Sequence, residues 1–189
     1  NYMAVSGITF LLPFYLIEGR GLGPGAAGLV LTAQPAVMSV AAPLAGSLSD
    51  RIGSRGPAVL GLAILAVALL LLSRIGATTP IPAVAATLGL AGLGSGIFIA
   101  PNNSALMGAA PRNRQGIAAA VLASARNVGM VLGVGIAGAV FATATAGSAG
   151  AAAVAGSVGH GFLIGAAIVA AGAVTSFLAR PERVDADER

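Results

Sequence analysis

Few side chains inside the long apolar stretches of this sequence could take part in chemistry. They are one arginine and four amides: Gln34, Asn102, Asn103, Arg126 and Asn127. A guanidinium and amides can hold a solute by hydrogen bonds or ion pairing. No carboxylate lies inside a complete apolar stretch, and the absence of cysteine excludes disulfides and thiolate metal sites. We therefore expect a binding role for these groups, with no metal site and no catalytic residue.

The composition determines what kind of element must position these groups. Of the 189 residues, 57% are hydrophobic and 8% are charged, and the mean hydropathy is +0.93. Soluble domains have about 25% charged residues, and disordered chains need low hydrophobicity. Aromatic residues make up 4%, too few for the aromatic girdles of a membrane β-barrel. The sequence therefore predicts an all-α, polytopic membrane protein.

Six apolar stretches approach the length of about 20 residues that a membrane-spanning helix needs. They cover residues 2–17, 26–48, 57–73, 82–107, 117–141 and 161–179. The first would rise only about 24 Å, and we interpret it as a span cut off at its start. Residues 142–159, rich in Gly, Ala and Ser, are predicted to form a flexible outer loop, and residues 180–189 a charged cytoplasmic tail. Residues 1–189 are thus predicted to form one six-helix domain.

The arginines indicate the orientation in the membrane. One set of loops and the tail hold Arg51, Arg55, Arg112, Arg114, Arg180, Arg183 and Arg189, whereas the opposite loops hold only Arg20 and Arg74. Because basic short loops stay in the cytoplasm, both chain ends are predicted to be cytoplasmic, with the protein in the inner (plasma) membrane. Despite a pI near 11.1, nucleic-acid binding is not expected, since the arginines are scattered and tryptophan is absent.

The polar residues follow a pattern that occurs twice. The first, second, fourth and fifth stretches carry prolines and polar groups, whereas the third and sixth are almost purely aliphatic. Prolines and polar groups at membrane depth are tolerated where they face protein or water. The pattern predicts a three-plus-three helix repeat, as in secondary transporters, with two helices per repeat along a path and one facing lipid.

Arg126 is the most informative residue, because it lies up to about 15 Å along the helix from Gly116. A charge at that depth is costly unless it is paired or hydrated, and it marks a functional site by default. We expect a role in a cavity or in coupling; the alternatives are a structural ion pair or a side chain that reaches the inner surface. The amides Gln34, Asn102 and Asn103, each beside a proline, either line the cavity or satisfy carbonyls that the proline leaves free.

The loop 46–55 reads G-S-L-S-D-R-I-G-S-R. Gly46 allows close helix approach and Gly53 a tight turn, while Asp50 suits a helix N-terminus and can pair with an arginine. We expect Asp50, together with Arg51 and Arg55, to form a latch at the cytoplasmic gate. The alternative is an ordinary basic loop that only sets the topology. The pairs Gly92/Gly96 and Gly129/Gly133 form G-x-x-x-G motifs and predict close helix packing.

This loop resembles the signature loop of the major facilitator superfamily, G-x-L-[AS]-D-R-x-G-R-[RK], with Ser54 in place of a basic residue. Further matches are the segment 92–96 leading to Pro101 and Asn102, the segment 114–118 after Pro111, and Arg126-Asn127-Val128-Gly129. Together they resemble the last six helices of the fourteen-helix drug:proton antiporter (EmrB/QacA-type) branch, over essentially the whole chain.

The resemblance implies the C-terminal half of a transporter, whose partner is a missing N-terminal half of the same chain. It places the first, second, fourth and fifth helices on a central cavity. It further implies proton-coupled multidrug efflux by alternating access, with amphipathic or cationic substrates, protons as the coupling ion, a proton gradient in place of any cofactor, and no enzymatic activity. The titrating acid must then come from the missing half.

Three alternatives remain. The protein could export another small molecule within the same superfamily. It could be a six-helix intramembrane serine protease with Ser95 as nucleophile and His160 as base, although Leu93 breaks the G-x-S-G motif of such enzymes. It could also be complete as six helices and act as a symmetric dimer.

Overall fold

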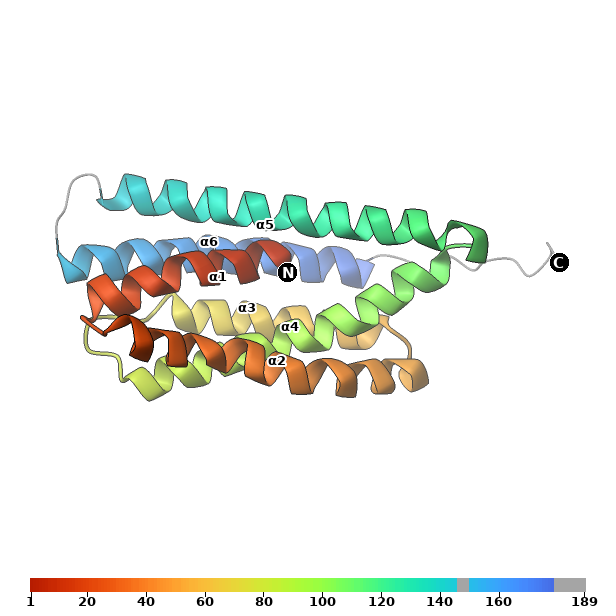
Figure 1. Cartoon of the computed structure of the whole chain (residues 1–189), viewed down its shortest axis with the longest axis horizontal. Coiled ribbons are helices and arrows are strands. Elements are labelled where there is room, and N and C mark those ends of the chain that lie inside the picture. Colours follow the sequence, from red (N-terminus) through yellow and green to blue (C-terminus); the bar gives the residue numbers. More distant parts are fainter. Residues whose placement is uncertain (146–149, 179–189) are drawn as a thin grey trace.

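The computed structural model describes residues 1–145 and 150–178, and every regular element within them is helical (Figure 1). The membrane-length helices are α1 (Tyr2–Phe14), continued by the π-helix η1 (Tyr15–Gly19), and α2 (Pro24–Ile52), α3 (Arg55–Leu72), α4 (Ile81–Ala109), α5 (Gln115–Thr145) and α6 (Ala151–Leu178). A 3-10 turn, η2 (Arg112–Arg114), precedes α5. The predicted all-α fold with six membrane-length apolar helices is confirmed.

The largest difference from the sequence-based ranges lies before the sixth span. Residues 142–159 were expected to form a loop, but α5 continues to Thr145 and α6 already begins at Ala151. Alanine is the strongest helix former, so an Ala-rich stretch extends a helix when its apolar side chains can be buried. Val154 and Val158, exposed to 8% and 0%, lie in the core. Residues 146–149 and the predicted tail, residues 180–189, lie outside the described residues.

The helix contacts repeat when every helix number is shifted by three. Helix α2 packs mainly against α4, and α5 correspondingly against α1. Helix α3 packs against α4, α6 correspondingly against α1, and α3 and α6 against each other. Each three-helix unit thus places its second helix on the first helix of the other unit. This exchange supports the predicted three-plus-three repeat and joins the two units into one bundle.

Glycines permit the two exchanged crossings. A Cβ on Gly92 of α4 would lie 2.2 Å from the Gln34 carbonyl oxygen of α2, and one on Gly96 would lie 2.9 Å from Ala41 Cβ. In the other crossing, a Cβ on Gly133 of α5 would lie 2.3 Å from the Met3 carbonyl oxygen of α1. Gly129, one turn earlier, would approach Tyr2 Cβ to 3.2 Å. The backbones therefore touch where the G-x-x-x-G motifs lie.

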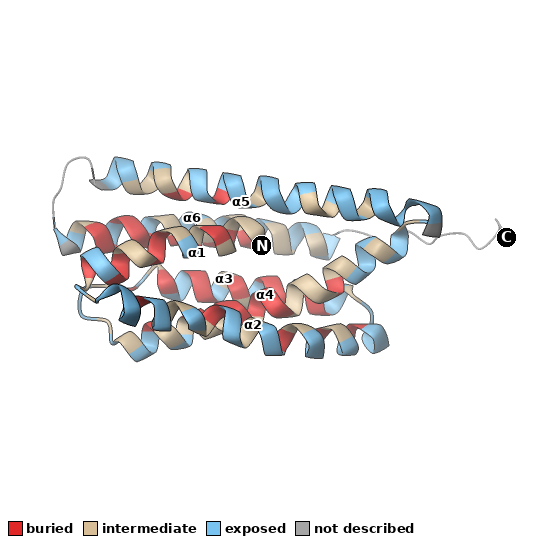
Figure 2. Ribbon diagram, in the orientation of Figure 1, coloured by how far each residue is buried: buried red, intermediate tan, exposed pale blue. Residues whose placement is uncertain are grey.

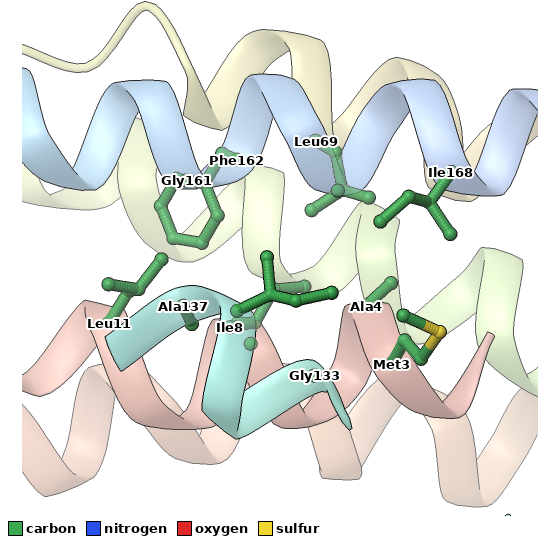
Figure 3. A pocket seen from close by; sticks show the side chains of 13 residues that line it. Met3, Ala4, Ile8, Leu11, Leu69, Gly133, Ala137, Gly161, Phe162 and Ile168 are labelled. Atoms are coloured by element: carbon green, nitrogen blue, oxygen red, sulfur yellow. The ribbon is translucent and has the colours of Figure 1, made fainter. Parts of the chain in front are cut away.

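Where α1, α5 and α6 meet, the interior is apolar and nearly filled (Figure 3). The residual cavity measures ≈ 20 Å³, about the space of a single water molecule. Ile8, Leu11 and Phe162 point toward it and are exposed to 1% each. Gly133 of α5 and Gly161 of α6 also line it, and a Cβ on either would collide with α1. This region is packed core with no room for a solute.

Burial is unequal among the helices. Half of the apolar window of α3 is buried (50%), compared with 17% for α2 and 11% for α5. Figure 2 shows α5 exposed along most of its length, whereas α3 and α4 contain runs of buried residues. The exchanged second helices α2 and α5 thus lie at the surface of the bundle, as does α6, which is also 17% buried.

We predict that Gly92→Ala destabilises the protein by about 1–3 kcal/mol, because its methyl group would collide with the backbone of α2. Gly89→Ala, one turn away in α4, is the matched control, since its Cβ would meet only Val37 Cγ2 at 3.4 Å. Thermal unfolding of the detergent-solubilised protein measures both. Equal melting temperatures for the two variants would contradict the close crossing.

Candidate functional site

An open cleft with a volume of ≈ 680 Å³ is formed by α1, α2, α4 and α5. These are the four helices whose polar residues stand out in the sequence. Its lining is Tyr2, Val5, Ser6, Thr9, Phe10, Met38, Ile99, Arg126, Asn127, Met130 and Val134. Ligand sites of drug-sized molecules measure about 300–1,000 Å³ and combine an apolar lining with a few polar groups. The cleft therefore has the size and lining of a small-molecule site.

Helix α1 contributes one continuous face to the cleft. Tyr2, Ser6 and Thr9 follow the i, i+4, i+7 spacing that aligns side chains on a helix. The Ser6 hydroxyl donates to the Met3 carbonyl oxygen (3.1 Å) and the Thr9 hydroxyl to that of Val5 (2.9 Å). With their protons used, both oxygens are left as acceptors. This face is not among the sites predicted from the sequence, although the spacing of its polar residues is a signal that could have identified it.

Helix α5 contributes Arg126 and Asn127, together with Met130 and Val134. Two of the five polar residues singled out in the sequence thus lie at the cleft. Both side chains are exposed, and within the described residues Arg126 makes no hydrogen bond or ion pair. The guanidinium is therefore available to a solute in the cleft.

The other three amides are placed differently. Gln34 is 7% exposed, at the crossing where Gly92 approaches its carbonyl group, and its Nε2 has no partner among the described residues. Asn102 and Asn103 follow the buried Pro101 and are half-buried, and Asn103 Oδ1 is likewise unpartnered within the described part. The cleft is instead lined by Met38 on α2 and Ile99 on α4, each about one turn from these amides.

The pair required for a serine protease is not brought together. Ser95 is fully buried in α4 (0% exposed), and its hydroxyl has no partner among the described residues. His160 is exposed on α6, where its Nδ1 lies 2.8 Å from the Gly156 carbonyl oxygen. The hollow beside His160 is lined by residues of the loop after α3 and of α6, without Ser95.

At the predicted gate, Gly53 ends α2 with φ 87°, a conformation that favours glycine, and Gly46 packs against Ala100. Asp50 and Arg51 are exposed, and Asp50 forms no ion pair with a described residue. Arg55 instead donates to the Phe177 carbonyl oxygen, and its guanidinium lies 5.6 Å from the centre of the Phe177 ring. The contact at this end therefore joins the start of α3 to the end of α6.

At the opposite end, the loop after α3 is held by groups that follow α1. The Tyr15 hydroxyl donates to the Gly76 carbonyl oxygen (2.7 Å), and Arg20 donates to the same oxygen (3.4 Å) and to that of Ala77. Tyr15 is fully buried at 0% exposure. These bonds fix the far end of α1, whose other turns line the cleft.

Comparison with known proteins identifies the architecture. The model of the Major Facilitator Superfamily matches residues 1–189. The chain is 35% identical over 140 residues to the riboflavin transporter RibZ of Clostridioides difficile, covering 74% of this chain and 31% of that protein. Identity is 32% over 143 residues to the multidrug resistance protein Stp of Mycobacterium tuberculosis, covering 74% of this chain and 26% of that protein.

A third relative extends over almost the whole chain. The methylenomycin A resistance protein of Streptomyces coelicolor is 32% identical over 184 residues, which is 95% of this chain and 37% of that protein. The matched part of this chain thus spans between a quarter and about two fifths of the length of these relatives.

We predict that the cleft is reached by water. The chain has no cysteine, so single cysteines can be introduced into a protein whose other cysteines, if any, are replaced by serine. Thr9→Cys and Met130→Cys should react with a membrane-impermeant methanethiosulfonate reagent, because a thiolate forms readily only in water. Val67→Cys, on the exposed apolar surface of α3 and more than one turn from the end of that helix, should not react. Equal labelling of all three positions would contradict a hydrated cleft.

Proposed function

The chain belongs to the major facilitator superfamily, and we propose that it forms the C-terminal half of a proton-coupled exporter of amphipathic small molecules. It is a multi-pass membrane protein and a transporter rather than an enzyme. The observation that carries the proposal is the cleft between α1, α2, α4 and α5, whose ≈ 680 Å³ are lined mainly by apolar side chains around one guanidinium.

The lining supports broad rather than narrow recognition. Phe10, Met38 and Met130 offer polarisable surface, and methionine adapts its shape to different ligands. Relatives carry the names of a riboflavin transporter, a multidrug resistance protein and a methylenomycin A resistance protein, which differ in what they handle. An apolar, adaptable cleft with few polar groups suits export of several amphipathic compounds.

The distribution of acidic residues bears on proton coupling. Glu18 and Asp50 are the acidic residues of the described part, and neither lines the cleft. A proton carrier within the transport path would therefore come from the rest of the protein. In this proposal, binding of substrate and of protons to opposite-facing states drives rocking of this half against the other.

The distribution of arginines between the two ends of the bundle supports an orientation of the protein in the membrane. The α2–α3 and α4–α5 connections lie at the same end of the bundle as the C-terminal end of α6 (Figure 1). Arg51, Arg55 and Arg114 lie at this end, whereas Arg20 and Arg74 lie at the other. We propose that the arginine-rich end faces the cytoplasm in the inner membrane, and that the whole protein belongs to the fourteen-helix drug:proton antiporters.

A transporter dedicated to one small molecule is the second candidate. The similarity to a protein named as a riboflavin transporter favours it. A dedicated carrier and a multidrug exporter differ in the number of unrelated compounds that they move, which the following experiment measures.

We predict that inside-out membrane vesicles containing the full-length transporter accumulate several unrelated amphipathic dyes, and that a protonophore abolishes accumulation. Val134→Trp should lower the initial rate at least about tenfold, since an indole would fill part of the cleft. Val67→Trp, on the 50% exposed outer surface of α3, is the matched control and should leave the rate unchanged.

Three results would contradict parts of this proposal. Accumulation that survives the protonophore would exclude proton coupling. Movement of a single compound would favour the dedicated carrier. An equal loss in both tryptophan variants would show that the cleft is not the transport path.

A further inference from the structure

We propose that Arg126 binds the negatively charged group of the transported molecule, so that the preferred substrates are amphipathic anions. This inference rests on the proposed function, because it takes the cleft as the transport site. It narrows the expectation drawn from the sequence, which included cationic substrates.

The position of Arg126 favours an anionic partner. The residue lies in the fourth turn of the 31-residue α5, about 16 Å along the helix from Gln115. A guanidinium at such depth is costly unless an anion or water compensates it. Arginine donates five N–H groups in a planar fork and accepts none, a geometry that matches a carboxylate with two parallel hydrogen bonds.

No such anion is supplied by the described residues. Arg126 has no ion pair or hydrogen bond within them. Of their two carboxylates, Glu18 follows the cleft residue Phe10 by about 12 Å of helix, and Asp50 follows Met38 by about 18 Å. A compensating charge would therefore come from a molecule that enters the cleft or from another part of the protein.

The surroundings of Arg126 favour a small molecule. Asn127 beside it and the Tyr2 hydroxyl add further donors, whereas Ser6 and Thr9 spend their protons on their own helix. Around these polar groups lie Phe10, Met38, Ile99, Met130 and Val134. One charged end and an extended apolar wall fit a molecule with an acidic group on a flat apolar body.

A cationic substrate meets the opposite situation. Its charge would be repelled by Arg126, and within the described residues the cleft offers no carboxylate to compensate. Such a substrate would need an acidic group from elsewhere in the protein, and Arg126 would still repel its positive charge. The charge of the cleft thus discriminates between two classes of amphipathic molecule.

Two xanthene dyes of similar ring structure and opposite charge test this inference: anionic fluorescein and cationic rhodamine 123. Binding to the full-length transporter in lipid nanodiscs is measured by fluorescence anisotropy. We expect wild type to prefer fluorescein. Arg126→Gln should weaken fluorescein binding by about 10- to 100-fold, the range expected for loss of a charged hydrogen-bonding partner, without weakening rhodamine binding.

Two further variants serve as controls. Arg126→Lys keeps the charge without the planar fork and should fall between wild type and Arg126→Gln. Arg74→Gln removes an exposed arginine that lines the separate hollow beside His160, and it should leave both dyes unaffected. Size-exclusion profiles and melting temperatures verify that every variant is folded.

Each outcome has a definite meaning. Preference of wild type for rhodamine, binding of neither dye, or an equal effect of Arg126→Gln on both would overturn the inference. An equal effect with a lowered melting temperature would identify a structural ion pair with a carboxylate of the same protein. If a protonophore stops rhodamine export but fluorescein binding does not depend on Arg126, the inference fails and the proposed function stands. If fluorescein binding depends on Arg126 but no proton-driven movement is seen, the proposed function fails and the inference stands.

Discussion

The close approach of helix backbones at two crossings is the constraint on which the rest of the structure depends. In a membrane, helices gain little by burying apolar surface against each other, because lipid is equally apolar, so packing and small residues determine which helices meet. Gly92 and Gly96 bring α4 onto α2, and Gly129 and Gly133 bring α5 onto α1. Each crossing joins the two repeats, so the bundle has no independent three-helix part.

The same crossings create the site. By placing α2 on α4 and α5 on α1, they leave α2 and α5 with little further packing, and both helices remain exposed. The cleft forms where these two pairs face each other, and the single guanidinium of the cleft belongs to the most exposed helix. The glycine-mediated crossings thus also account for the exposure of a charge at membrane depth.

The features that follow from local rules could be predicted from the sequence. Apolar length identified the six helices, and the G-x-x-x-G spacing selected glycines that lie at the crossings. The high cost of a charge at membrane depth pointed to Arg126. The prediction that failed depended on tertiary packing. The composition of the stretch before the sixth span predicted a loop, but Val154 and Val158 are buried in helix α6. Similarly, Gln34 lies in a crossing because Gly92 admits the α2 backbone there, and a polar side chain alone does not reveal which side of its helix faces a cleft.

The central claim is that the cleft between α1, α2, α4 and α5 is the place where the transported molecule binds. A cryo-electron microscopy structure of the full-length transporter with a transported anionic dye tests this most directly. The account predicts dye density in this cleft, with its acidic group against Arg126 and its rings against Phe10 and Met130. Density for the dye elsewhere, with a helix of the same protein filling the cleft and a carboxylate paired with Arg126, would contradict it.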